Sequence, residues 1–149
     1  MDSFLTQPKE NAMSESDRTA AAATFAATDL AALADRYLAA WNETDAARRR
    51  ALIGSTWTES ASYVDPLMRG DGHAGIDAMI AAVQQRFPGF RFTRVTPVDA
   101  HGGNLRFTWE LAPAGAAAVV AGTDFATVAA DGRLQSMTGF IDRAPEGLA

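Results

Sequence analysis

The feature that most constrains the fold is the strict alternation of apolar and polar residues over Leu105–Leu111, with the sequence LRFTWEL. This period of two is typical of a strand that buries one face. Neighbouring segments have similar composition and are separated by glycine, asparagine or proline turns. We expect further strands over Phe90–Val98, Val119–Val128 and Leu134–Asp142, with turns at His101–Asn104, Pro113–Gly115 and Ala130–Gly132. The second half therefore predicts a meander of about four antiparallel strands.

The first half carries helical periodicity instead. Between Leu30 and Trp41 the large apolar residues fall on one helical face, with Thr28–Asp29 as the expected cap, although the alanines Ala20–Ala23 could begin the helix earlier. A short second helix is expected up to Ile53, ended by Gly54, with Arg48–Arg50 as its solvated side.

A strand and a third helix complete the first half. Trp57–Val64 has strand-like composition, and a flexible loop is expected over Leu67–Gly72. The third helix should begin after Asp71 or His73 and end at Pro88–Gly89. Helices combined with an antiparallel sheet predict an α+β domain.

Composition limits the classes of function. With 149 residues, 48% of them hydrophobic, the chain suffices for one domain; we expect a flexible tail over 1–24 and a single domain over 25–149. A net charge of −5 with scattered basic residues argues against nucleic-acid binding. Since no segment has the apolar length of a membrane span and no cysteine is present, we expect a cytoplasmic protein without membrane partners.

Asp65 and Tyr37 are the first candidate site residues. Asp65 closes the Trp57–Val64 strand and precedes Pro66, which cannot continue a sheet ladder, so its carboxylate is either a catalytic base or a turn residue. Tyr37 faces the interior of the first helix. Its hydroxyl needs a partner, which is either a backbone carbonyl in the core or a group in a cavity.

Asp124 is the second candidate carboxylate. It shares one strand face with Val120, Gly122, Ala126 and Val128. A carboxyl buried in such company has a raised pKa or a partner. The alternative is that the opposite face, with Val119, Ala121 and Phe125, is the buried one and Asp124 is exposed.

Histidines and aromatic residues are weaker candidates. His73, near a helix N-terminus, is either a ligand contact or a capping residue, whereas His101 lies in a turn and should be exposed. Two separated histidines do not form a metal site, and no phosphate-binding loop is present. Most large aromatics belong to a core, but some should line a cavity; together with His73, the expected ligand contacts are Trp57, Trp109, Phe107 and Phe140.

Three motifs resemble the nuclear transport factor 2-like superfamily, most closely its SnoaL-like branch and the ketosteroid isomerases. They are Tyr63–Pro66, Gly72–Ile76 and Asp131–Met137. The likeness covers roughly Leu30–Asp142. It implies a cone-shaped, curved antiparallel sheet with helices in the first half, as in cystatin-like folds, and the scaffold serves many chemistries.

The resemblance also implies roles for three residues. Asp65 matches the general base of the ketosteroid isomerases, Asp124 their protonated oxyanion-hole aspartate, and Tyr37 their oxyanion-hole tyrosine. We therefore expect an acid-base enzyme without cofactor or metal, of isomerase, cyclase or dehydratase type. It would act on a small hydrophobic carbonyl compound through an enolate. The alternative is a ligand-binding or assembly domain without chemistry. The superfamily also implies a homodimer formed through the outer face of the sheet.

Overall fold

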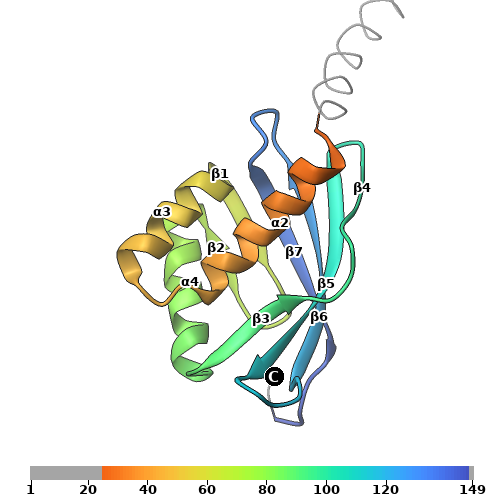
Figure 1. Ribbon diagram of the computed structural model, residues 1–149. Coiled ribbons are helices and arrows are strands. Elements are labelled where there is room, and N and C mark those ends of the chain that lie inside the picture. The colour runs from red at the N-terminus through yellow and green to blue at the C-terminus, as the bar shows by residue number, and fades with distance from the viewer. Residues whose placement is uncertain (1–24, 148–149) are drawn as a thin grey trace, which may run out of the picture.

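The computed structural model describes residues 25–147. Within this range the chain forms three helices, α2 (Ala27–Asn42), α3 (Ala46–Thr56) and α4 (Gly72–Arg86) (Figure 1). The strands of the same range are β1 (Trp57–Val64), β2 (Arg69–Asp71), β3 (Phe90–Arg94), β4 (Asp99–His101), β5 (Asn104–Pro113), β6 (Val120–Val128) and β7 (Leu134–Arg143). The α+β class is confirmed. The expected tail, residues 1–24, and the alternative helix start at Ala20–Ala23 lie outside the described residues.

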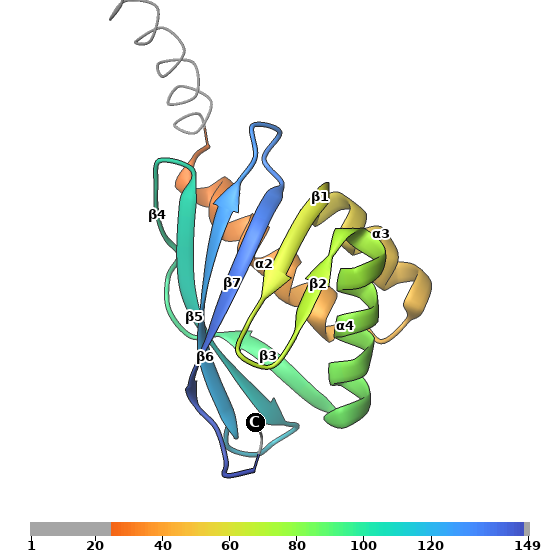
Figure 2. The same ribbon diagram turned by 180° about the vertical axis from the view of Figure 1, so that it is seen from behind.

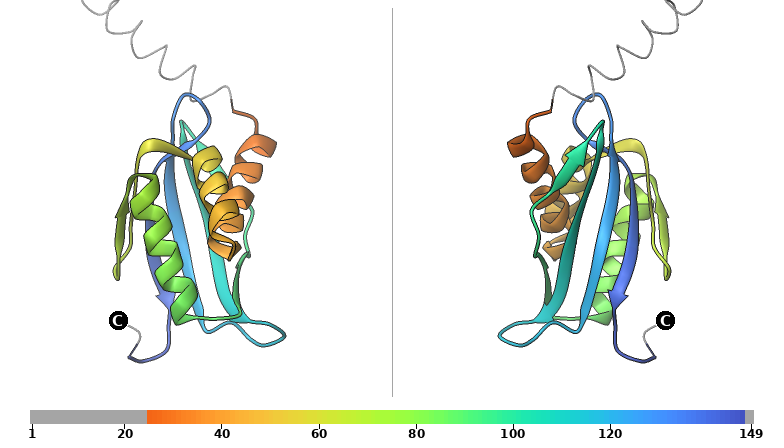
Figure 3. Two further views of the ribbon diagram at one scale, coloured as in Figure 1. Left: turned by 90° about the vertical axis from the view of Figure 1, so that its left-hand side faces the viewer. Right: turned by 90° about the vertical axis from the view of Figure 1, so that its right-hand side faces the viewer.

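The strands of the described range form one curved, seven-stranded sheet in the order β2-β1-β7-β6-β5-β3, with β4 also paired to β5. The helices gather on its inner side, and from behind the sheet lies in front of α2 (Figures 2 and 3). The expectation of a purely antiparallel sheet was wrong in one place, because β1 and β7 are parallel. A parallel pair needs a long connection, and here the connection contains α4 and the strands β2 to β6.

Helix α2 packs against the inner face of the sheet with its apolar side. It begins two residues before Asp29, and the Asp29 carboxylate accepts a hydrogen bond from the backbone N–H of Ala26 at 3.3 Å. At the other end, the Asn42 side chain bonds both backbone groups of Phe92, at 2.8 and 2.9 Å. These bonds attach the helix to the edge strand β3. Tyr37 and Trp41 thereby keep a fixed position against the sheet.

Helix α3 corrects the expectation that Arg48–Arg50 are all solvated. Arg49 is only 6% exposed, and its Nε donates to Asp77 Oδ1 at 2.6 Å. Its Nη1 donates to the carbonyl of Glu43 and to Gln84. Successive helical residues point about 100° apart, so the three arginines cannot share one side. Arg49 therefore links α3 to α4.

The expected strand Phe90–Val98 is interrupted. It ends at Arg94 and resumes at Asp99, while both parts pair with β5. Between them Pro97 has no N–H to donate, and the Thr96 hydroxyl accepts the bond from the backbone N–H of Thr108 at 2.9 Å. The expected loop Leu67–Gly72 also differs, because Arg69–Asp71 pairs with β1 as a short strand.

The core lies between the helices and the inner face of the sheet. Its largest fully buried side chains include Trp57, Tyr37, Phe107, Leu33 and Ile53. Residues 25–147 contain no helix whose length and hydropathy would let it cross a membrane.

Candidate active site

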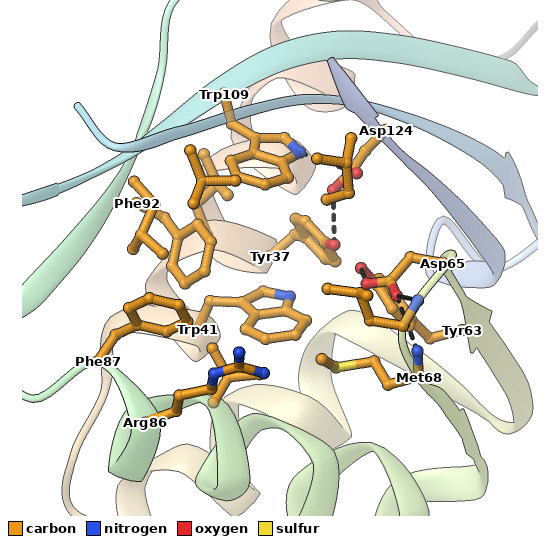
Figure 4. A pocket seen from close by; sticks show the side chains of 16 residues that line it. Tyr37, Trp41, Tyr63, Asp65, Met68, Arg86, Phe87, Phe92, Trp109 and Asp124 are labelled. Atoms are coloured by element: carbon orange, nitrogen blue, oxygen red, sulfur yellow. Dashed lines mark hydrogen bonds between the residues drawn. The ribbon is translucent and has the colours of Figure 1, made fainter. Parts of the chain in front are cut away.

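An apolar cavity opens between α2, α4, the loop after β1 and the strands β5 to β7. Its volume is about 70 Å³. Side chains of 16 described residues line it (Figure 4). Most are apolar or aromatic; the charged ones are Asp65, Asp124 and Arg86. Such a cavity suits a small apolar ligand that meets a few polar groups.

Asp124 lies at the inner end of this cavity and is 2% exposed. The hydroxyl of Tyr37 donates to its Oδ2 at 2.7 Å, and the indole Nε1 of Trp109 donates to its Oδ1 at 2.9 Å. Of the two alternatives left open for β6, the structure has the Asp124 face buried. Phe125, on the opposite face, is exposed. The alternative of a core tyrosine bonded to a backbone carbonyl is also excluded for Tyr37.

Burial raises the pKa of Asp124 to about 6. The hydrogen bonds from Tyr37 and Trp109 oppose this rise, and the charges of Asp65 and Asp142 add to it. Both protonation states are therefore accessible near neutral pH. Burial, followed by the charge of Asp124, raises the pKa of Tyr37 well above its ordinary value, so Tyr37 remains a hydrogen-bond donor.

Asp65 is both a turn residue and a cavity residue. Its Oδ1 accepts hydrogen bonds from the backbone N–H groups of Leu67 and Met68, at 2.7 and 2.9 Å. Its Oδ2 accepts the hydroxyl of Tyr63 at 2.7 Å. An ionised carboxylate has about four acceptor sites, so three are occupied and one is left for a ligand. The turn thus fixes the carboxylate at the rim.

Gly139 on β7 lets the two acids approach each other. It pairs with Asp124 across the ladder. A Cβ at this position would lie 3.0 Å from the Tyr63 hydroxyl, 3.1 Å from Asp124 Oδ1 and 3.1 Å from Asp65 Cβ. All three groups therefore crowd around one small volume that only glycine leaves open.

Four of the expected ligand contacts lie outside the cavity. His73, in the first turn of α4, donates a hydrogen bond from Nε2 to the backbone carbonyl of Trp57 at 2.9 Å. The rings of Trp57 and Phe107 are buried and pack edge-on against Tyr37, so they support the site from behind. Phe140 is 53% exposed because it points to the outer face of β7.

Trp109 does line the cavity. His101 is exposed, as expected.

Tyr63 and Trp41 are among the cavity residues that the sequence interpretation did not name as site residues. Tyr63 lies two residues before Asp65, and the period of a strand places such residues on one face. Trp41 follows Tyr37 by four residues, which places both on one side of α2. Both spacings are visible in the sequence. Apolar composition alone does not show whether such a residue lines a cavity or is packed in the core.

Within residues 25–147, no group of three or more histidine, aspartate or glutamate side chains is arranged to hold a metal ion.

Comparisons with known proteins agree with this architecture. The sequence profile of the SnoaL-like domain matches residues 34–137. The crystal structure of a candidate isomerase of the SnoaL-like family from Agrobacterium tumefaciens is 46% identical, with a TM-score of 0.74, over 77% of this chain and 98% of that one. A comparison with curated protein sequences gives no significant match.

More distant structures share the fold alone. A candidate SnoaL-like polyketide cyclase from Jannaschia is 20% identical, with a TM-score of 0.57, over 74% of this chain and 85% of that one. A protein with a cystatin-like fold from Methylobium petroleophilum is 19% identical, with a TM-score of 0.64, over 84% of each chain. The expected fold family is confirmed.

Proposed function

This chain belongs to the SnoaL-like domain family, and from that premise we propose that it is an isomerase- or cyclase-type enzyme acting by acid-base chemistry on a small apolar carbonyl compound. One observation carries the proposal: a buried Tyr37–Asp124 hydrogen bond ends an apolar cavity whose rim holds a second carboxylate, Asp65. The similarity to the Agrobacterium candidate isomerase supports the same class.

The chemistry follows from the positions of the two acids. Asp65 takes a proton from the carbon next to the ligand's carbonyl, and the electrons of that C–H bond move onto the carbonyl oxygen as an enolate. Protonated Asp124 donates a hydrogen bond to the enolate oxygen, and Tyr37 adds a second one by turning its hydroxyl, which donates to Asp124 in this structure, toward the ligand. Return of the proton to another carbon gives isomerisation, whereas attack of the enolate on a second carbonyl gives cyclisation.

The apolar walls support this assignment of roles. Burial raises the pKa of Asp124 to about 6, and a ligand that displaces water disfavours the ionised form further. A neutral carboxyl can donate, which an ionised one cannot. Asp65 lies in the turn after β1, where three accepted hydrogen bonds hold its carboxylate in place.

Exchange of the α-hydrogens of acetophenone in D₂O, followed by proton NMR, tests the proposal without knowledge of the natural substrate. Asp65→Asn should lower the protein-catalysed rate by about 100-fold or more, because an amide is no base. The fold should persist, since the amide oxygen still accepts from Leu67 and Met68. Asp131→Asn is the matched control: Asp131 also accepts a turn bond, from Arg133 N, but lies outside the cavity lining, and its variant should keep the rate.

The second candidate is a ligand-binding domain without chemistry. It is favoured by the three hydrogen bonds that Asp65 already accepts, because they occupy most of the acceptor sites that a catalytic base would use. In that case acetophenone would bind, but neither the wild type nor Asp65→Asn would exchange its hydrogens above the protein-free rate.

A further inference from the structure

Trp41 carries a hydrogen-bond donor that the proposed chemistry leaves unused. The residue lies on α2, is 5% exposed and lines the cavity. Among the described residues its indole Nε1–H has no hydrogen-bond acceptor. In Figure 4 the nitrogen edge of the indole is turned toward the open middle of the cavity, on the side of Tyr37 and Asp65.

The other donors of the cavity's aromatic side chains are occupied. Tyr37 donates to Asp124, Trp109 donates to the same carboxyl, and Tyr63 donates to Asp65. Buried polar groups almost always have a partner. A buried N–H that faces a cavity without one therefore indicates that the partner arrives with the ligand.

The indole is held in place by its neighbours. Its ring packs against Phe92 and Tyr63 with centroid separations of 5.2 and 5.6 Å, and against Tyr37 at 6.4 Å. Hydrogen bonding from Trp41 opposes the rise in the pKa of Tyr37, so the indole N–H faces the Tyr37 hydroxyl, although the geometry falls short of a formed hydrogen bond. The donor is thus fixed near the Tyr37–Asp124 pair before any ligand enters.

We propose that the Trp41 indole N–H binds the carbonyl oxygen of the ligand, and that the cavity selects small, flat, apolar compounds with one carbonyl acceptor. The choice of a carbonyl rests on the proposed function. Unlike Asp124, an indole is a donor at every ordinary pH. Trp41 would therefore hold the oxygen in the resting complex, while Asp124 adds its hydrogen bond only when protonated.

Two nearly isosteric probes test this inference: acetophenone, which has the acceptor, and α-methylstyrene, in which a CH₂ group replaces the oxygen. The wild type should bind acetophenone about tenfold more tightly. At pH 8, where Asp124 is ionised and cannot donate, Trp41→Phe should reduce this preference to nearly one. Because both probes lose the same ring contact in that variant, the ratio isolates the N–H.

Trp57→Phe is the matched control. The Nε1–H of Trp57 is also buried without an acceptor among the described residues, but Trp57 does not line the cavity. This variant removes an equivalent donor and should keep the tenfold preference. A preference that falls equally in both variants would mean that general loosening of the core is responsible.

A second measurement uses the wild-type protein alone and therefore does not depend on whether a Trp41 variant folds. In a proton–nitrogen NMR spectrum of the wild type, the Trp41 indole resonance should shift with acetophenone much more than with α-methylstyrene. An unmoved resonance, or absence of binding by both probes, overturns the inference. If acetophenone shifts the Trp41 resonance but its hydrogens are not exchanged, the proposed function fails and the inference holds. If the hydrogens are exchanged while the Trp41 resonance does not move, the inference fails and the proposed function holds.

Discussion

At the scale of single residues, Asp124 is the group whose protonation decides what the cavity can do. As a neutral acid it donates to a ligand oxygen, and as an anion it can only accept. Its pKa of about 6 places this change within the working range of most proteins. Burial is the main cause, so the behaviour depends on the apolar lining as much as on Asp124 itself.

The pH dependence of acetophenone exchange follows from this value. The protonated form predominates below pH 6 and is lost above it, so kcat/KM, which reports the unliganded protein, should fall as the pH rises through about 6. Asp124→Asn carries an amide donor at every pH and should lose this fall while keeping part of the rate. A kcat/KM that instead rises through pH 6 would identify Asp124 as the base.

Single residues also show what could be predicted from the sequence. The interior position of Tyr37 followed from periodicity and was correct, whereas periodicity left open which face of β6 is buried. Trp57, Phe107 and Phe140, expected as ligand contacts, do not line the cavity, because periodicity gives the face on which a side chain lies but not whether a cavity or packed atoms are found there. The missing N–H partner of Trp41 depends on atomic geometry that no pattern contains.

At the scale of elements, β7 brings the two acids together. It lies between β1 and β6, and its Gly139 is opposite Asp124. Any larger residue would stand between Asp124, Tyr63 and Asp65. The glycine here serves close approach, since its backbone is not among those with positive φ.

Gly139→Ala should therefore reduce acetophenone exchange strongly, because the added methyl group separates the carboxyls. The crowding should also lower the free energy of unfolding by about 1–3 kcal/mol. Gly54→Ala is the control: nothing lies within 4 Å of a Cβ there, and the change should raise helix stability by up to about 1 kcal/mol with the rate unchanged. Thermal unfolding and the exchange rate of both variants check this; a Gly139→Ala protein with wild-type exchange contradicts it.

The type of most helices and strands was predicted correctly, but some of their bounds and contacts were not. The bounds of β1 and the end of α4 followed from apolar alternation and Pro88–Gly89. The break between β3 and β4 was not predicted. Pro97 is a readable signal against one continuous strand, whereas the Thr96 hydroxyl that replaces a backbone group in the ladder is not. The burial of Arg49 depends on Asp77, 28 residues away, and pairings of this kind are not visible in local sequence.

At the scale of the whole molecule, the outer face of the sheet remains uncovered within residues 25–147. Phe140 and Phe125 are exposed there on adjacent strands. The register pairs Phe140 with Thr123 and Phe125 with Thr138, which makes the two rings diagonal neighbours. We propose that this face joins two copies of the chain, as the resemblance to the superfamily implies.

Light scattering should then give a dimer for the wild type and a monomer for Phe140→Glu, because a buried unpaired charge at the interface is costly. Val95→Glu is the control, since Val95 is 50% exposed but lies in the segment between β3 and β4. A monomeric wild type, or a dimer that survives Phe140→Glu, would show that the outer face is not the contact.

The parallel pairing of β1 with β7 also affects how the chain is made. Among the described strands, β7 comes last in the chain and lies in the middle of the sheet, so β1 has no partner on that side until β7 emerges. Pairing between distant segments is slow, and unpaired strand edges favour aggregation. A chain shortened before Leu134 would lack more than an end: its sheet would be divided in two. In this topology the strands that carry Asp65 and Asp124 are joined through β7, so the site forms only after β7 has been made.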